Sequence, residues 1–137
     1  CTAVHDADIL TQECDILAPC ALGNVIDGSM VQSLRCQILC GASNNILGDP
    51  EEDAVALKTA GIVYAPDFVV NAGGLIHLAG MHLGMIDATL QTKNDEIFET
   101  SLQILQRGEA ASSTYAAAVE IAEQRISGAK ETGIHAG

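Results

Sequence analysis

Three segments of the chain combine residue types that could hold a flat, polar ligand. Each contains glycine, which lets the backbone approach a ligand closely, and small or amide-bearing side chains that offer hydrogen-bond donors and acceptors. The segments are CALGN (20–24), GASNN (41–45) and PDFVVNAGG (66–74). Asn45 and Asn71 supply the amides for such a ligand. Glycine and asparagine are also ordinary turn residues, so turns and a binding site are equally good interpretations at this point.

Metal and nucleophile chemistry finds little support in the spacing of histidines and cysteines. His77 and His82 are five residues apart, miss the i, i+4 spacing of HExxH and have no accompanying carboxylate. Cys36 and Cys40 would lie about 13 Å apart along a strand, too far to share one ion. No histidine lies near Cys20 in sequence, which favours a structural thiol over a nucleophile. We therefore expect no metal site.

The sequence has no motif for binding a phosphate. Neither GxGxxG nor GxxxxGK[ST] occurs in the 137 residues. The first 86 residues contain only two basic side chains, Arg35 and Lys58. If this chain handles a nucleotide, the phosphate half of the site lies elsewhere.

Composition indicates one folded domain. The chain has 137 residues, 48% of them hydrophobic, and a mean hydropathy of +0.25, which excludes disorder. No apolar run approaches the roughly 18 residues that span a membrane. A net charge of −12 argues against a nucleic-acid partner. Five cysteines without CxxC or a signal peptide indicate reduced thiols and a cytoplasmic location.

Short apolar runs precede the three candidate segments and would position them. These runs are almost continuously hydrophobic, which is typical of parallel strands covered on both faces, and they lie at 14–19, 36–41 and 61–66. Helical stretches are expected between or before them at 5–12, 30–34 and 50–60. Parallel strands end at one edge of a sheet, in the crevice where ligands bind. The three segments would line that crevice together.

Local signals also predict where helices begin and end. Asp49 and Pro50 predict a helix start and Gly61 its stop. Beyond residue 66 the chain is predicted to be helical, and 131–137 is predicted to be a disordered tail. Candidate N-caps for the last helix are Ser112, Ser113 and Thr114, with Gly128 beyond its end. The predicted packing stripes are Ile97, Phe98, Leu102, Ile104 and Leu105, then Tyr115, Val119, Ala122 and Ile126.

Three strands make a small α/β sheet, and one edge strand would have nothing beside it. The chain also begins with Cys1 and not with Met. Either it was processed or it is part of a longer protein, and we expect something else to complete the sheet.

Three stretches of sequence carry a resemblance to a known family. ECDILAPCALGNVID (13–27), CGASNN (40–45) and GIVYAPDFVVNAGGLIHLAG (61–80) closely resemble the NAD-dependent amino-acid dehydrogenases acting on leucine, valine and phenylalanine. Glutamate dehydrogenases are more distant relatives. The resemblance runs from about residue 2 to 127, and IHL after the paired glycines looks more like the phenylalanine enzymes.

The resemblance implies a two-domain, homo-oligomeric enzyme that deaminates an L-amino acid to its 2-oxo acid and ammonia with NAD.

 The family's first domain carries the catalytic lysine and aspartate, and its Rossmann domain opens with GxGxxG. None of these lies in this sequence, so no catalytic residue is expected here. The chain would be one partial Rossmann NAD-binding domain, with strand and helix units in 1–86, C-terminal helices in 87–130 and the tail in 131–137. An N-terminal catalytic segment would be its missing partner.

The resemblance also assigns roles to individual residues. Cys20, Ala21 and Leu22 correspond to the loop beside the nicotinamide ribose. Asn45 corresponds to an asparagine near the reacting carbon, where it contacts substrate or cofactor, and Asn71 to one that holds the nicotinamide amide.

Two leucines correspond to positions that line the pocket for the substrate side chain. They are Leu75 and Leu78, which the residues alone would assign to an ordinary core. A different class of function also fits the short sheet: a non-catalytic interaction module that completes its sheet with a partner chain.

Overall fold

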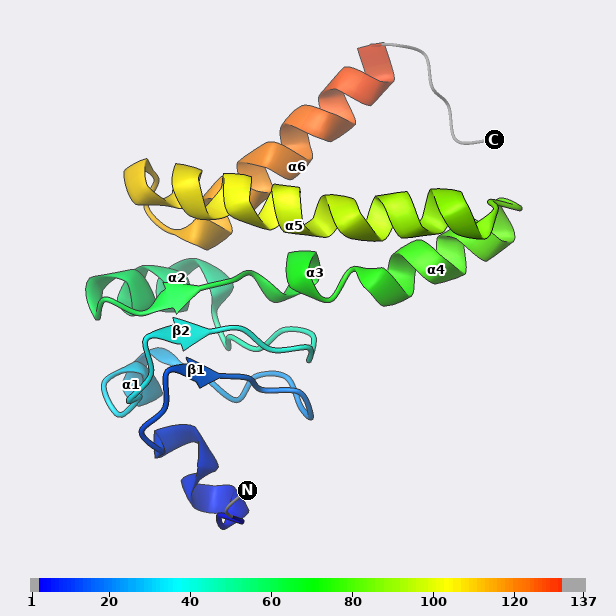
Figure 1. Ribbon diagram of the computed structural model, residues 1–137. Coiled ribbons are helices and arrows are strands. Elements are labelled where there is room, and N and C mark those ends of the chain that lie inside the picture. The colour runs from blue at the N-terminus through cyan, green and yellow to red at the C-terminus, as the bar shows by residue number, and fades with distance from the viewer. Residues whose placement is uncertain (1–2, 132–137) are drawn as a thin grey trace.

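The computed structural model describes residues 3–131 and contains a three-stranded parallel sheet followed by helices (Figure 1). The strands are β1 (Ile16–Leu17), β2 (Ile38–Leu39) and β3 (Val63–Tyr64), in the order β1-β2-β3. Ile38 pairs with Ile16 on one side and with Val63 on the other. Each strand lies inside one of the predicted apolar runs, so the predicted α/β class is confirmed.

The connections between the strands follow the local signals in the sequence. The 3-10 helix η1 (Asp6–Thr11) precedes β1, and α1 (Gly28–Val31) and α2 (Pro50–Thr59) join the strands. The Asp49 carboxylate accepts hydrogen bonds from the backbone N–H groups that open α2, and Pro50 occupies the first turn. Gly61 follows the helix with a φ of +77°, a conformation that favours glycine. The predicted start and stop of this helix are confirmed.

The main core lies between the sheet and these connecting helices. Its members include Leu17, Ile26, Leu39, Ile46, Leu47, Leu57 and Tyr64. On the opposite face, Ile16 is 56% exposed and Val63 is 44% exposed. The prediction that both sheet faces are covered is therefore wrong for residues 3–131. Apolar runs indicate strands, but they do not show that a covering layer is present.

Four helices follow the sheet: α3 (Asp67–Val70), α4 (Gly73–His82), α5 (Asp87–Ala110) and α6 (Thr114–Glu131). The Ser113 hydroxyl accepts a hydrogen bond from the Ala116 N–H, which confirms a predicted N-cap for α6. Gly128 lies inside α6, so its predicted place beyond the helix end is wrong. The predicted tail lies outside the described residues except for Glu131, which is helical. Within residues 3–131, no helix is both long enough and apolar enough to cross a bilayer.

The buried faces of α5 and α6 differ from the predicted stripes. On α5 the buried residues are Leu90, Ile104 and Gly108, whereas Phe98 is 69% exposed. On α6, Ile121 is buried and Ile126 is 56% exposed. Helical spacing identified possible apolar faces, but the rotation of each helix against its neighbours decided which face is covered.

Candidate functional site

The three candidate segments lie at one edge of the sheet. Each follows its strand directly, and because the strands are parallel the chain leaves them toward the same side (Figure 1). We call this region, residues 20–24, 41–45 and 66–74, the strand-end edge.

Hydrogen bonds from backbone and side-chain groups join the first two segments of the strand-end edge. The Asn24 N–H donates to the Asn45 carbonyl at 2.6 Å, and the Ser43 hydroxyl donates to the Pro19 carbonyl at 2.9 Å. The Cys20 sulfur accepts a hydrogen bond from the Ala42 N–H at 3.5 Å. These bonds hold the second segment against the first.

A side-chain amide joins the second segment to the third. Asn71 Nδ2 donates to Asn44 Oδ1 at 2.6 Å and to the Ala42 carbonyl at 3.3 Å. Asn71 is therefore paired with Asn44, the neighbour of the predicted Asn45. The Asn45 side chain is exposed at this edge, and its backbone has a φ of +53°. The Asn45 amide is thus exposed to solvent, whereas the Asn71 amide is hydrogen-bonded to the second segment.

The buried carboxylate of Asp67 accepts a hydrogen bond from the backbone directly after the second segment. Asp67 is only 5% exposed, and its Oδ2 accepts a hydrogen bond from the Ile46 N–H at 2.7 Å. Its own N–H donates to the Tyr64 hydroxyl at 3.3 Å. Burial raises the pKa of Tyr64 above its usual value, so this hydroxyl stays protonated. Sequence reasoning missed Asp67 as a positioning residue, because its only signal was an acidic residue at a helix start.

The glycines of the strand-end edge have different surroundings. A Cβ at Gly23 would collide with the Asn44 carbonyl, and one at Gly41 would collide with the Pro19 backbone. By contrast, a Cβ at Gly74 would meet open space. At Gly23 and Gly41 the close approach that glycine permits is an approach of one loop to another.

The remaining predicted cofactor-side residues present an open, mixed surface. Cys20, Ala21 and Leu22 are all exposed, and the Leu22 side chain is 73% exposed. Burial, followed by the nearby Cys20, raises the pKa of the Cys40 thiol just behind this loop. The strand-end edge thus presents an exposed apolar side chain, Leu22, and an exposed amide, Asn45.

The predicted substrate-pocket residues lie on α4 and are accessible. Leu75 is 72% exposed and Leu78 is 64% exposed. The interpretation of these leucines as ordinary core is therefore wrong for the described chain. Their contact with a substrate stays a prediction.

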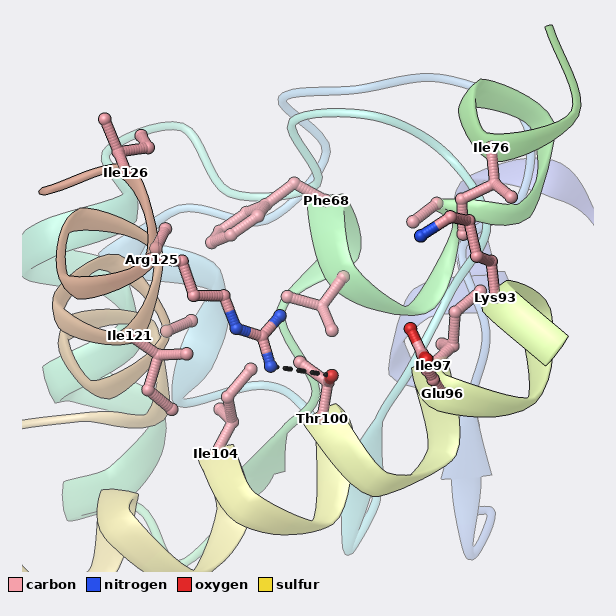
Figure 2. Close-up of a pocket in the computed structure, with 14 residues that line it drawn as sticks. Phe68, Ile76, Lys93, Glu96, Ile97, Thr100, Ile104, Ile121, Arg125 and Ile126 are labelled. Carbon is pink, nitrogen blue, oxygen red and sulfur yellow. Dashed lines mark hydrogen bonds between the residues drawn. The ribbon is translucent and has the colours of Figure 1, made fainter. Parts of the chain in front are cut away.

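A separate hollow of about 420 Å³ lies among α3, α4, α5 and α6, and we call it the helical pocket (Figure 2). Its walls include Phe68, Ile76, Ile97, Ile104 and Ile121. The Arg125 guanidinium reaches across it, and Nη2 donates to the Thr100 hydroxyl at 3.1 Å. Sequence reasoning did not predict this pocket, because its walls come from four helices that are distant in sequence.

A parallel sheet with glycine- and amide-bearing loops at its carboxyl edge is the arrangement in which open α/β proteins bind nucleotides and similar ligands. The family model that matches residues 1–133 is "Glutamate/Leucine/Phenylalanine/Valine dehydrogenase". The chain therefore belongs to this amino-acid dehydrogenase family, whose enzymes use NAD(P).

Known proteins similar to the chain include several amino-acid dehydrogenases. A valine dehydrogenase of Streptomyces virginiae is 43% identical over 134 residues, covering 94% of this chain and 37% of the relative. A leucine dehydrogenase of Thermoactinomyces intermedius is 38% identical over 130 residues, covering 94% of this chain and 35% of the relative. The crystal structure of L-tryptophan dehydrogenase from Nostoc punctiforme matches with a TM-score of 0.87 and 34% identity, covering 95% of this chain and 40% of that one. The chain thus spans little more than a third of the length of these relatives.

Proposed function

We propose that the chain supplies the nicotinamide side of a cofactor site in an NAD-dependent dehydrogenase of large neutral L-amino acids. The reaction converts the amino acid, water and NAD⁺ to a 2-oxo acid, ammonia, NADH and a proton. The observation that carries the proposal is the convergence of the three family-like segments at the strand-end edge. In the complete enzyme, this chain would be a partial Rossmann domain, and an N-terminal segment would supply the catalytic residues. The complete enzyme would be a homo-oligomer.

The cofactor role divides between fixed and free groups of the strand-end edge. NAD, when bound, accepts a hydride from the substrate α-carbon. Cys20, Ala21 and Leu22 would cover one side of the nicotinamide ribose, and Asn71 would use its remaining hydrogen-bonding capacity for the carboxamide. The exposed Asn45 amide would orient the substrate or the carboxamide at the reacting carbon. Asp67 would position this loop through its hydrogen bond from the Ile46 N–H.

Preference for neutral substrates follows from the side chains on α4. Leu75 and Leu78 would form an apolar wall, so a glutamate carboxylate would be buried there without a partner. Leucine, valine or phenylalanine side chains would gain from apolar burial at the same place. The similarity to leucine, valine and tryptophan dehydrogenases supports this class of substrate without distinguishing among its members.

A chimaera tests the proposal most directly. Residues 1–133 would replace the matching segment of the leucine dehydrogenase relative, which supplies the remaining two-thirds of an enzyme. We expect NAD-linked oxidation of leucine or phenylalanine and a preference over glutamate well beyond the factor of about 10–200 that one methylene gives. A folded chimaera that binds NADH but turns over no amino acid would favour the interaction-module alternative. Glutamate as its best substrate would contradict the apolar wall.

Two substitutions of Asn45 in that chimaera distinguish the contribution of its side-chain amide from that of its left-handed backbone conformation. Asn45→Ala should lower kcat/KM about 100-fold, or about 2.7 kcal/mol, because the orienting amide is lost. Asn45→Gly is the matched control for the left-handed backbone at φ +53°, since glycine adopts it freely and also lacks the amide. Both variants should therefore lose the same activity. A loss in the alanine variant alone would assign Asn45 to the turn.

The isolated chain provides a further check of this division of labour. Residues 1–137 contain neither the family's catalytic lysine segment nor a GxGxxG loop. General acid–base catalysis contributes about 10²–10⁴-fold, and reactant positioning contributes more. We expect no measurable deamination by the purified chain, and turnover with leucine or phenylalanine would show that catalysis resides here.

A further inference from the structure

Two cysteines lie opposite each other at the amino ends of the first two strands. The register pairs Ile16 with Ile38, and two residues earlier in each strand it brings Cys14 opposite Cys36. The Cys14 N–H donates to the Arg35 carbonyl at 3.1 Å, which confirms that this pairing extends beyond the regular strands. Both thiols are free. Neighbouring strands lie about 4.8 Å apart, within the Cα separation of about 4.4–6.8 Å that a disulfide bridges.

Both thiols also share one environment. Each is half-buried and packs against the main core. Burial, followed by the neighbouring Cys14 sulfur, raises the pKa of the Cys36 thiol. The electrostatic effect of one sulfur on the other is a second sign that they are close together.

We propose that Cys14 and Cys36 form a vicinal dithiol that closes reversibly into a disulfide by exchange with a small disulfide such as oxidised glutathione. The Cys14 thiolate attacks one sulfur of glutathione disulfide, forms a mixed disulfide and releases one glutathione thiolate. The Cys36 thiolate then attacks the Cys14 sulfur, forms the intramolecular bond and releases the second glutathione. Two protein thiols are oxidised, and one glutathione disulfide is reduced to two thiols.

The first exchange step changes the electrostatic surroundings of the Cys36 sulfur. Burial and the neighbouring Cys14 sulfur raise the pKa of the Cys36 thiol, which lowers the fraction of Cys36 present as thiolate before the first step. Once Cys14 is in the mixed disulfide it carries no negative charge, so its electrostatic effect on Cys36 disappears. The first step therefore makes the second easier.

The chain contains a second cysteine pair that serves as an internal control. Cys20 Sγ accepts a hydrogen bond from the Ala42 N–H, so Cys20 lies beside Ala42 and is offset along the strands from Cys40. This pair is not in register, although the Cys20 sulfur is close enough to contribute to the raised pKa of the Cys40 thiol. Strand register therefore distinguishes the two pairs. It lies at the strand-end edge, whereas Cys14 and Cys36 lie at the opposite end of the strands, away from the proposed cofactor site.

The test is equilibration of the 137-residue chain carrying Cys1→Ser with mixtures of reduced and oxidised glutathione, followed by alkylation and intact-mass measurement. Trypsin cannot assign the bond alone, because cuts after Arg35 and Lys58 leave two cysteines in each peptide. Variants assign it instead. We expect a species with two cysteines protected from alkylation, which therefore carries two alkyl groups fewer than the alkylated reduced chain and is about 2 Da lighter than the reduced chain before alkylation. It should persist in Cys20→Ser/Cys40→Ser and disappear in Cys14→Ser and in Cys36→Ala.

A second probe does not depend on oxidation. Phenylarsine oxide bridges two neighbouring thiols, so it should bind with one-to-one stoichiometry to Cys20→Ser/Cys40→Ser, and this binding should be lost when Cys14→Ser is added to that variant. A stable glutathione adduct without the lighter species, or an intramolecular bond that survives Cys14→Ser, would overturn the proposal. Neither readout involves dehydrogenase activity, so failure here leaves the proposed function standing, and the reverse also holds.

Discussion

The sheet region (residues 14–65) and the helical region (residues 67–131) bury their apolar side chains to different extents. In the sheet region, Ile26, Leu39, Ile46 and Leu57 are completely buried in one continuous core. The core of the helical region is a small cluster of Ile104, Ala118 and Ile121. Several apolar side chains of the helical region are more than 60% exposed, among them Leu75, Leu78, Leu83, Ile86 and Phe98.

The difference reflects how each kind of element satisfies its backbone. A strand needs a neighbouring strand for its hydrogen bonds, so parallel pairing and the crossovers bring distant apolar residues together. A helix satisfies its own interior backbone groups and can leave an apolar face open to solvent or to a pocket. The open faces and the helical pocket are therefore where the helical region has most to gain from further burial.

The largest expected effect is a core truncation in the sheet region. Leu39→Ala should lower the free energy of unfolding by about 2–5 kcal/mol, because it removes a fully buried side chain from the middle strand and leaves a cavity. Phe98→Ala in the helical region should change it by less than about 0.5 kcal/mol, because that side chain is 69% exposed. Urea unfolding measures both. Equal losses would show that the two regions are equally packed.

A pair of glycine substitutions should act in opposite directions. Gly41→Ala should destabilise the chain by about 1–3 kcal/mol, because the new Cβ would collide with the Pro19 backbone. Gly74→Ala in α4 should stabilise it by up to about 1 kcal/mol, because its Cβ meets open space and alanine is the better helix former. Thermal unfolding of the two variants gives the sign of each effect. Destabilisation by Gly74→Ala would reveal a constraint on α4 that its open surroundings do not predict.

A lysine connects the two regions. Lys58 Nζ, from α2, donates to the carbonyls of Gly108, Glu109 and Ala111 at 2.8, 3.0 and 2.5 Å at the end of α5. Lys58→Met keeps most of the apolar stem but removes this cap, and should cost about 1 kcal/mol. Lys93→Met is the matched control, since Lys93 lies mid-helix and should matter less. Amide hydrogen exchange should show faster opening of the end of α5 in the first variant alone.

The smallest expected effect concerns a helix cap in the sheet region. The Ser29 hydroxyl and then the Met30 N–H donate to Asp27 and lower the pKa of its carboxyl below 3.8. Because the folded pKa is the lower one, this cap contributes above about pH 3.8 and is lost as pH falls through the folded pKa. Ser29→Ala should move the Asp27 pKa back toward 3.8, as an NMR titration can measure. An unchanged Asp27 pKa would show that Ser29 is not the main cause of the lowered value. In the helical region, neither α4 nor α5 has a side-chain cap of this kind.

The sequence by itself determined the features that depend on a few neighbouring residues. Short apolar runs were sufficient to locate the three strands, and Asp49, Pro50 and Gly61 were sufficient to delimit α2. The strand-end edge also followed, because parallel strands necessarily end on the same side of their sheet. Family-like segments then indicated the kind of ligand that this edge would hold.

Only the tertiary structure decided which groups at that edge are fixed and which are free. It paired Asn71 with Asn44, left Asn45 exposed and buried the Asp67 carboxylate under the Ile46 N–H. It also oriented α5 so that, of the residues in one predicted stripe, Ile104 is buried and Phe98 is exposed. These outcomes depend on strand register and helix packing between residues far apart in the chain, and local spacing carries no information about either.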